Sequence, residues 1–228
     1  MAEKPCALIV GAGSGLSASL ARLFAKDGYD IPLAARDTTK LNALVKETGA
    51  RAYACDSSQE ADVAALFTSI ANDFGDLDLA VYNPSFRTRG PFIEILPADV
   101  EKTLAITVYG AFLVGQAAAR VMLPRGKGSI FLTGASAGVK GYPQSAPFAM
   151  GKFALRGLAQ SMARELSPQG LHIAHFVIDG GIRPEGMAVD GDKMLEADAI
   201  AESYFHVHKQ HRSAWSWEVE VRPWVETF

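Results

Sequence analysis

The sequence has few cysteines and little net charge. Its 228 residues include two cysteines, Cys6 and Cys55, and both lie in apolar runs. Two such cysteines exclude a disulfide scaffold and indicate buried thiols in a reducing cytoplasm. The formal net charge is −3, so the chain offers no basic field to a nucleic acid or to an anionic membrane. We therefore expect a cytoplasmic protein with no nucleic-acid partner.

Long apolar segments and flexible linkers are also missing. We find no stretch that approaches the roughly 20 apolar residues of a membrane span, and we expect no membrane partner. The N-terminal apolar run is too short for a secretory signal and leads directly into a predicted strand. No repeat, low-complexity tract or linker marks a domain boundary. The sequence thus predicts one domain over residues 1–228.

Short apolar runs alternate with longer amphipathic segments along the chain, as in a parallel sheet wrapped by helices. Strands are predicted at residues 6–10, 31–35, 51–55, 77–82, 129–133, 171–178 and 217–221. Helices are predicted from about residue 14 and at residues 39–45, 60–71, 98–122, 146–166 and 197–209. Several strands are apolar almost throughout, which favours helices on both faces. We predict an α/β Rossmann fold with a doubly wound, seven-stranded parallel sheet.

A glycine-rich turn, Gly11-Ala-Gly-Ser-Gly15-Leu-Ser17, connects the first predicted strand to a helix. Glycines let the backbone approach a pyrophosphate closely, and a helix N-terminus offers free N–H groups and the positive end of its dipole. Because the turn opens a βαβ unit, it favours dinucleotide binding over a purely structural tight turn.

The ends of the next two strands carry residues that would select the cofactor. Arg36 has the fork of donors and the fixed charge that suit a 2′-phosphate. If Arg36 were only a solvated surface charge, Asp37 would be the acid that accepts from a ribose hydroxyl. We favour NADP over NAD. Asp56, after the third strand, either accepts from the adenine amino group or caps the next helix.

Taken in order, the motifs resemble the short-chain dehydrogenase/reductase family over almost the whole chain. The resemblance is carried by GAGSGL, AARD and CD after the first three strands, by YNPS after the fourth, by GSIFLTGASAG, and by FAMGKFALRGLAQSMARELSPQGLHIAHFVIDGGIR. It implies an oxidoreductase acting on a small carbonyl compound or alcohol. It also implies a homodimer or homotetramer paired through the predicted helices 98–122 and 146–166. The cofactor-binding residues that it implies are Gly11, Ser14, Gly15, Leu16, Arg36, Asp56, Ser57, Asn83, Lys152 and Ile182.

Three of the four catalytic positions of the family hold other residues here. The family's Asn, Ser, Tyr and Lys align with Thr107, Ala135, Phe148 and Lys152, so Lys152 alone is kept as a catalytic residue. Phe148 has no proton to give, and Ala135 has no hydroxyl to hold a carbonyl oxygen. The resemblance implies that Lys152 bridges the ribose hydroxyls of the nicotinamide; the alternative is a solvated surface lysine. The third glycine that is usual in the turn is Ser17, which would loosen the packing of helix on strand.

Other hydroxyls near these positions are candidates to replace the missing acid or donor, although each also has a structural interpretation: Ser136, Tyr142, Ser145 and Tyr109. Three functions remain open. The first is an NADP-dependent oxidoreductase with a substituted acid, and the second is a non-catalytic NADP-binding sensor or assembly subunit. The third is a changed reaction that uses Lys152 as a base or electrostatic centre.

Two further segments are candidates for ligand binding. Residues 180–195 follow the sixth strand and form either a lid over the ligand crevice or an ordinary connecting loop. His206, His208 and His211 have offsets that do not share a helix face, so we expect no metal site.

Overall fold

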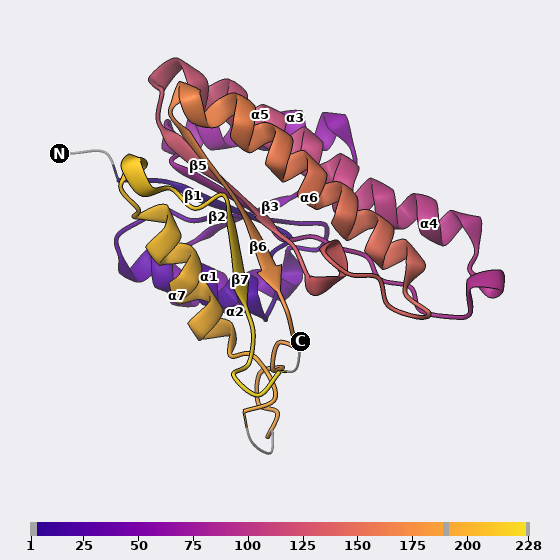
Figure 1. Ribbon diagram of the computed structural model, residues 1–228. Coiled ribbons are helices and arrows are strands. Elements are labelled where there is room, and N and C mark those ends of the chain that lie inside the picture. Colours follow the sequence, from indigo (N-terminus) through magenta and orange to yellow (C-terminus); the bar gives the residue numbers. More distant parts are fainter. Residues whose placement is uncertain (1–3, 189–191, 227–228) are drawn as a thin grey trace.

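The computed structural model describes residues 4–188 and 192–226, and it has a central sheet between two layers of helices (Figure 1). The sheet has seven strands in the order β3-β2-β1-β4-β5-β6-β7, and every neighbouring pair is parallel. The strands are β1 (Ala7–Val10), β2 (Pro32–Ala35), β3 (Arg51–Ala54), β4 (Leu79–Tyr82), β5 (Gly128–Thr133), β6 (Leu171–Ile178) and β7 (Glu218–Val221). The predicted doubly wound α/β fold is confirmed.

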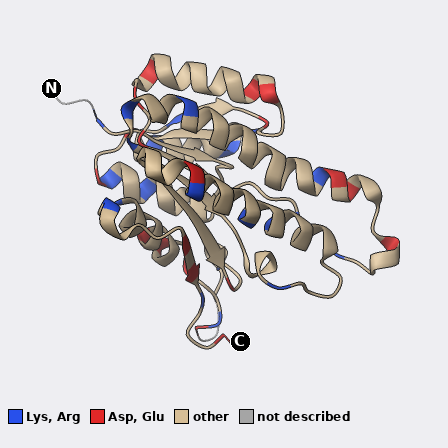
Figure 2. Cartoon of the chain, turned by 45° about the horizontal axis from the view of Figure 1, so that its top comes forward, with Lys and Arg blue, Asp and Glu red and all other residues tan. Residues whose placement is uncertain are grey.

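The helices cover the two faces of the sheet in separate groups (Figure 1). One face carries α1 (Leu16–Lys26), α2 (Asn42–Thr48) and α7 (Ala197–His208). The other carries α3 (Glu60–Phe74), α4 (Pro97–Leu104), α5 (Gly110–Met122) and α6 (Ala146–Leu166). Acidic and basic residues are scattered over these helices in Figure 2 rather than separated by sign.

Each face of the sheet has its own hydrophobic core, because successive side chains of a strand point to opposite faces. Leu8 and Val10 of β1 belong to the core under α3, α5 and α6. Ala7 and Ile9 belong to the core under α1 and α7. All four side chains are buried, which explains why the run ALIV has no polar residue. The almost continuous apolar strands are therefore a consequence of two-sided burial.

The order in which strands are added to the sheet reverses between β1 and β4. The chain first steps outward through β1, β2 and β3, and then places β4 on the other side of β1. The carboxyl ends of β1 and β4 therefore border a crevice that no connection crosses, which is where ligands enter open α/β sheets. The glycine turn after β1 and the segment that begins with Asn83 after β4 both lie at this edge.

The long helix predicted at residues 98–122 is interrupted in the structure. Between α4 and α5 the chain makes a π-helical turn, Ala105–Tyr109, so the helical run changes its hydrogen-bond spacing in the middle. The run Pro97–Arg125 has 29 residues and is long and apolar enough to cross a membrane by length and composition. This contradicts our expectation that no stretch is long enough. Half of its most apolar window is buried inside the fold, as in a core helix.

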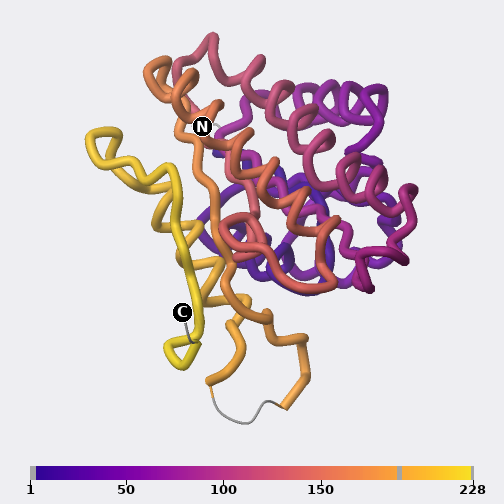
Figure 3. Tube along the Cα trace, turned by 45° about the vertical axis from the view of Figure 1, so that its right-hand side comes forward, coloured from indigo at the N-terminus to yellow at the C-terminus, as the bar shows by residue number. Residues whose placement is uncertain are grey.

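The segment between β6 and α7 projects from the body of the molecule (Figure 3). Its two ends are joined by a bridge between Ile182 and Leu195 and by an ion pair of 2.6 Å between Arg183 and Glu196. Residues 189–191 of this predicted irregular stretch lie outside the described residues. In the described part, the two ends of the segment are held together by these contacts. The choice between a lid and a connecting loop stays open.

Candidate active site

The turn after β1 brings the backbone close to its neighbours at Gly11 and leaves open space beside Gly13 and Gly15. Gly11 has φ +81°, and a Cβ there would come within 2.8 Å of Pro84. The Gly11 N–H donates to the Ala34 carbonyl over 2.9 Å, which ties the turn to β2. By contrast, a Cβ on Gly13 or Gly15 would meet no atom within 4 Å. Gly11 is therefore required by packing, whereas Gly13 and Gly15 keep the space next to the turn open.

The N-terminus of α1 presents an uncompensated positive dipole end beside this turn, at a hollow that Ser14 and Gly15 line. Gly15 precedes the helix, and no side chain caps it. The first turn also contains no acidic residue that would offset the dipole. Free N–H groups at such an end bind anions, so the geometry fits a pyrophosphate.

Ser17 and Asn83 join the glycine turn to the end of β4. The Ser17 hydroxyl donates to the Gly11 carbonyl over 3.0 Å, and the Asn83 amide donates to Ser17 Oγ over 2.8 Å. The Asn83 N–H also donates to the Val10 carbonyl over 3.0 Å. The expectation that Ser17 loosens the packing is wrong, because its side chain is buried and bonded on both sides.

A cavity of about 420 Å³ lies over the carboxyl ends of β1 to β4 and is lined by half of the ten predicted cofactor residues. Its lining includes Gly11, Arg36, Asp56, Ser57 and Asn83. In the sequence these residues follow separate strands, and the structure brings them together.

The charge at the end of β2 is basic rather than acidic. The Asp37 carboxylate accepts from the Thr39 N–H over 3.0 Å and from the Thr39 hydroxyl over 2.5 Å. These hydrogen bonds lower the pKa of Asp37 and hold its carboxylate in a local turn. Arg36 is exposed and forms no ion pair with any residue that the structure describes, while Lys40 lines the same cavity.

Asp56 and Ser57 are also held by local contacts. Asp56 Oδ1 accepts from the Ser58 N–H over 3.0 Å and from the Ser58 hydroxyl over 2.7 Å, and these bonds lower its pKa. Gln59, not Asp56, occupies the N-cap position of α3, so the helix-cap interpretation is wrong. The Ser57 hydroxyl pairs with the buried Tyr82 hydroxyl at 3.1 Å. The contact of Asp56 with adenine stays a prediction.

A second cavity, of about 640 Å³, adjoins the first, since both are lined by Asn83 and Ser85. It lies over the carboxyl ends of β5 and β6 and includes Lys152 and Ile182. Three other predicted residues lie elsewhere. Ser14 and Gly15 border a separate hollow of about 180 Å³ that faces residues 183–186, and Leu16 is buried at the start of α1.

Lys152 is buried at the wall of the second cavity. Its side chain is on α6, the residue is 3% exposed, and its ammonium donates to the Thr133 carbonyl over 2.7 Å. Burial lowers the pKa of Lys152 to about 7. The surface-lysine interpretation is therefore wrong. The ammonium lies 5.7 Å from the centre of the Phe148 ring, as expected for residues on one helix face.

Two of the hydroxyls singled out in the sequence meet in this cavity. The Tyr142 hydroxyl donates to Ser136 Oγ over 2.9 Å, and both residues line the cavity with Ala135 and Phe148. The Lys140 ammonium lies 5.7 Å from the centre of the Tyr142 ring. Tyr142 thus combines access to the cavity, a hydroxyl partner and a nearby cation.

The other two hydroxyl candidates and Thr107 have different surroundings. Thr107 is fully buried in the π-helical turn, and its hydroxyl accepts weakly from the Phe86 N–H over 3.4 Å. Tyr109 is exposed and stacks on Phe112. Ser145 lines the cavity, and its hydroxyl is buried with no hydrogen-bond partner in the described part of the chain.

Arg87 and Arg89 line the second cavity and were missed by sequence reasoning. They lie in the segment after β4, where no periodicity predicts the direction of a side chain. The Arg87 guanidinium lies 4.8 Å from the centre of the Phe148 ring. The fragment Phe-Arg-Thr-Arg-Gly was a visible signal of paired charge, but its contact with α6 depends on the tertiary fold.

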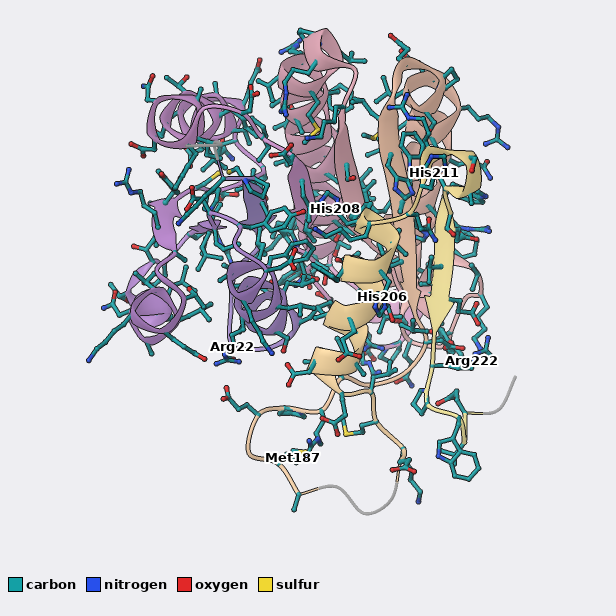
Figure 4. The ribbon with its side chains drawn as sticks, turned by 90° about the vertical axis from the view of Figure 1, so that its left-hand side faces the viewer. Arg22, Met187, His206, His208, His211 and Arg222 are labelled. Carbon is teal, nitrogen blue, oxygen red and sulfur yellow. The ribbon has the colours of Figure 1, made fainter. Side chains whose placement is uncertain are left out.

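The histidines near the C-terminus occupy separate positions (Figure 4). His208, on α7, lies 2.9 Å from Ser129 Oγ and 3.0 Å from the Tyr29 hydroxyl through its two ring nitrogens. His206 is exposed on the same helix, and His211 contacts Ser213 beyond its end. Their contacts are structural ones.

The comparisons with known proteins agree with this geometry. A profile of the short chain dehydrogenase family matches residues 5–191. Momilactone A synthase of Oryza sativa is 35% identical over 203 residues, which cover 84% of this chain and 72% of that protein. The crystal structure of a short-chain dehydrogenase from Rhodopseudomonas palustris has a TM-score of 0.85 and 32% identity, over 96% of this chain and 99% of that one. A metagenomic short-chain oxidoreductase in complex with NADP has a TM-score of 0.84 and 28% identity, over 96% and 97% of the two chains.

Proposed function

Because this chain belongs to the short-chain dehydrogenase/reductase family, we propose that it is an NADP-dependent oxidoreductase in which Tyr142 replaces the usual tyrosine acid. The observation that carries the proposal is the hydrogen bond of 2.9 Å between Tyr142 and Ser136 in the cavity that Lys152 also lines. Its substrate would be a small carbonyl compound or alcohol. The tetrad positions would be Thr107, Ala135, Phe148 and Lys152.

The residues around the two cavities and the hollow beside Ser14 and Gly15 fit a nicotinamide dinucleotide. The N-terminus of α1 and the open side of Gly13 and Gly15 would hold the pyrophosphate. Arg36 would bind the 2′-phosphate, because the Asp37 carboxylate is engaged by Thr39. When bound, the nicotinamide supplies or accepts a hydride. Complex formation of a relative with NADP supports this choice of cofactor.

The remaining cofactor residues divide between the two cavities, with one group on the adenosine side and the other on the nicotinamide side. Asp56 and Ser57 would border the adenosine, and Asn83 lies where the two cavities meet. Lys152 and Ile182 line the second cavity, on the nicotinamide side of this arrangement. Lys152 would exchange its bond to the Thr133 carbonyl for ribose hydroxyls.

The proton chemistry is assigned to the Tyr142–Ser136 pair. In reduction, the Tyr142 O–H bond breaks and its proton bonds to the carbonyl oxygen of the substrate as hydride reaches the carbon. Ser136 Oγ would hold that oxygen in place of the hydroxyl that Ala135 lacks. The Lys140 ammonium lies 5.7 Å from the centre of the Tyr142 ring and places a positive charge beside this donor. Tyr142 is 39% exposed, so solvent water restores its proton.

A second candidate function is a changed reaction that uses Lys152. Its motivation is that burial lowers the pKa of this lysine to about 7, so a neutral amine is available near pH 7 to accept a proton. Under this alternative Lys152 would take the role of base, and Tyr142 would be dispensable. The third candidate, a non-catalytic NADP-binding sensor or assembly subunit, is favoured by the absence of a side-chain hydroxyl at Ala135 and Phe148.

A substrate screen with four proteins separates these functions. Binding of NADPH and of NADH is first measured by fluorescence. If the wild type binds neither cofactor, every candidate function is contradicted. The wild type, Tyr142→Phe, Lys152→Ala and Phe148→Tyr are then tested against carbonyl compounds and alcohols. The proposal expects wild-type turnover that Tyr142→Phe abolishes. Turnover lost only in Lys152→Ala supports the lysine reaction. Activity that arises only in Phe148→Tyr supports the non-catalytic candidate.

We also propose one domain over residues 1–228, a cytoplasmic location and a homodimer or homotetramer without nucleic-acid or membrane partners. The oligomer is supported by exposed apolar side chains at the π-helical turn, on α5 and on α6, namely Tyr109, Phe112, Met150 and Phe153. Tyr109 and Phe112 stack on each other, with ring centres 6.5 Å apart. Such a surface is favourable to bury against a second copy.

A further inference from the structure

The N-terminus of α6 opens onto the second cavity without an internal partner for its dipole. This helix has 21 residues, its first turn contains no acidic residue, and no side chain caps it. Ser145 is its N-cap residue, and Ser145 and Phe148 both line the cavity. The positive end of a long helix therefore lies at the substrate side of the proposed active site.

Ser145 gives an independent sign that a ligand belongs here. The residue is 1% exposed, and its hydroxyl has no hydrogen-bond partner among residues 4–188 and 192–226. An N-cap serine ordinarily accepts from a backbone N–H of the first turn, and leaving a buried hydroxyl unpaired is unfavourable. A ligand oxygen at the cavity wall would supply the missing partner.

Two arginines of the segment after β4 line the same cavity as Ser145 and Phe148. Arg87 and Arg89 line the cavity, and the Gly90 N–H donates to the Gln144 carbonyl over 3.1 Å. This backbone hydrogen bond holds the arginine segment directly beside Ser145. The Arg87 guanidinium lies 4.8 Å from the centre of the Phe148 ring, so the fork is placed over the first turn of α6.

The acidic groups that line the cavity do not neutralise these arginines. Neither Arg87 nor Arg89 has an ion pair within the described residues, and burial together with the Arg89 charge lowers the pKa of Arg87. Asp179 lies 3.9 Å from the Lys140 ammonium, which offsets its charge. The remaining carboxylate of the lining is Glu226. The wall formed by Arg87, Arg89 and the α6 N-terminus is therefore positive.

We propose that Arg87, Arg89, Ser145 and the N-terminus of α6 form a binding site for an anionic oxygen group of the substrate. The substrate class would then be a carbonyl compound or alcohol that carries a carboxylate or a phosphate. Guanidinium forks bind both groups in a bidentate manner, and the Ser145 hydroxyl donates a further hydrogen bond. This inference rests on the proposed function, and it names the substrate class of the same cavity.

The site is distinct from the phosphate sites proposed for the cofactor. Those sites lie at Arg36 and at the N-terminus of α1, which border other cavities. Arg87 and Arg89 instead share a cavity with Phe148, Tyr142 and Lys152, where the reacting carbon of a substrate would be held. An anion bound there would orient that carbon relative to Tyr142.

The test compares ligands that differ only in charge. The probes are 2-oxopentanoate, 4-oxopentanoate and 5-oxohexanoate, each beside its methyl ester, together with inorganic phosphate as a competitor. Their binding is measured by saturation-transfer NMR and calorimetry with the full chain, with and without saturating NADP. The variants are Arg87→Gln with Arg89→Gln, and Ser145→Ala. Arg120→Gln is the matched control, because Arg120 is an exposed arginine of α5 outside the cavity.

We expect at least one oxo acid to bind the wild type about tenfold or more tightly than its ester, as charge-assisted hydrogen bonds imply. The double arginine variant should lose this preference, Ser145→Ala should lose part of it, and Arg120→Gln should keep it. Phosphate should displace the acid and not the ester; a phosphate affinity above that of every acid would identify a phosphate substrate.

Three results would overturn the proposal. One is equal binding of acids and esters, or no binding of any acid up to tens of millimolar. Another is an acid preference that persists without both arginines. The third is a loss of NADPH affinity in the double variant, which would assign the arginines to the cofactor. Acid and ester are also compared without NADP. The comparison therefore still tests the anion site if the chain does not bind NADP.

Discussion

The Tyr142 hydroxyl donates a hydrogen bond to Ser136 Oγ across 2.9 Å, at the wall of the cavity that Lys152 and Phe148 also line. The two residues lie on the short connection between β5 and α6, six positions apart. Their contact places a proton donor and an oxygen-binding hydroxyl side by side. Under the proposed function, this single loop would supply both the acid and the oxygen-binding hydroxyl.

Tyr142→Phe should therefore lower kcat by about 10²-fold or more, because a positioned general acid contributes about that factor. Ser136→Ala should lower kcat as well, by removing a donor to the carbonyl oxygen. Affinity for NADPH should stay unchanged in both variants, as measured by fluorescence titration. Tyr109→Phe is the control, since Tyr109 is exposed and stacked on Phe112. Full activity in Tyr142→Phe would exclude Tyr142 as the acid.

Cofactor selection should depend on Arg36. Removing its guanidinium in Arg36→Ala should weaken NADPH binding by about 10- to 100-fold and leave NADH binding nearly unchanged, because charge-assisted hydrogen bonds to the 2′-phosphate would be lost. Asp37→Asn is the matched control at the next position, and its carboxylate is bonded to Thr39. Equal losses of NADPH and NADH in Arg36→Ala would contradict the proposed role.

The strand pattern could be predicted because burial on two faces leaves a direct mark in the sequence. The runs ALIV and LAVY are apolar throughout, and both strands are fully buried. The edges were less certain. Cys6 forms an isolated bridge to Asp30 instead of extending β1, and the strand predicted from residue 77 begins at Leu79. The π-helical turn at Ala105–Tyr109 was not predictable, since its residues keep an apolar helical pattern.

The candidate site was predictable where it depends on sheet topology. Gly11, Arg36 and Asn83 each follow a strand, and parallel strands bring their carboxyl ends to one edge. Side-chain direction was not predictable in the connections. Ser57 turns its hydroxyl to Tyr82, and Arg87 reaches Phe148 of α6 from a segment that a backbone hydrogen bond between Gly90 and Gln144 holds beside this helix. Local sequence does not encode such long-range contacts.

The oligomer should form through the apolar surface of α5 and α6. Phe153 is 46% exposed on α6, so Phe153→Glu would place a charge in a buried contact, which is unfavourable. We expect light scattering to show a dimer or tetramer for the wild type and smaller species for Phe153→Glu. Phe92→Glu is the control, because Phe92 is also exposed but precedes α4. A wild-type monomer, or an unchanged assembly in Phe153→Glu, would contradict the proposal.

Acid should destabilise the fold through His208. Its ring nitrogens contact Ser129 and Tyr29, and burial, followed by the charge of Lys209, lowers its pKa from 6.5 to about 4. Because the folded chain holds the neutral ring, the stability that it contributes is complete above about pH 6.5 and is lost as the pH falls toward 4. The shift corresponds to roughly 3 kcal/mol of unfolding free energy.

Urea unfolding at pH values from 7.5 to 4 measures the unfolding free energy of the wild type and of two histidine variants, and the effect is the difference between their pH dependences. His208→Gln should be less stable at pH 7.5, since it disturbs the contacts with Ser129 and Tyr29. Its unfolding free energy should fall less than that of the wild type as the pH decreases, because no buried imidazole has to take up a proton. His206→Gln, which changes an exposed histidine of the same helix, should keep the wild-type slope. Parallel curves for His208→Gln and the wild type would show that other groups determine the acid sensitivity.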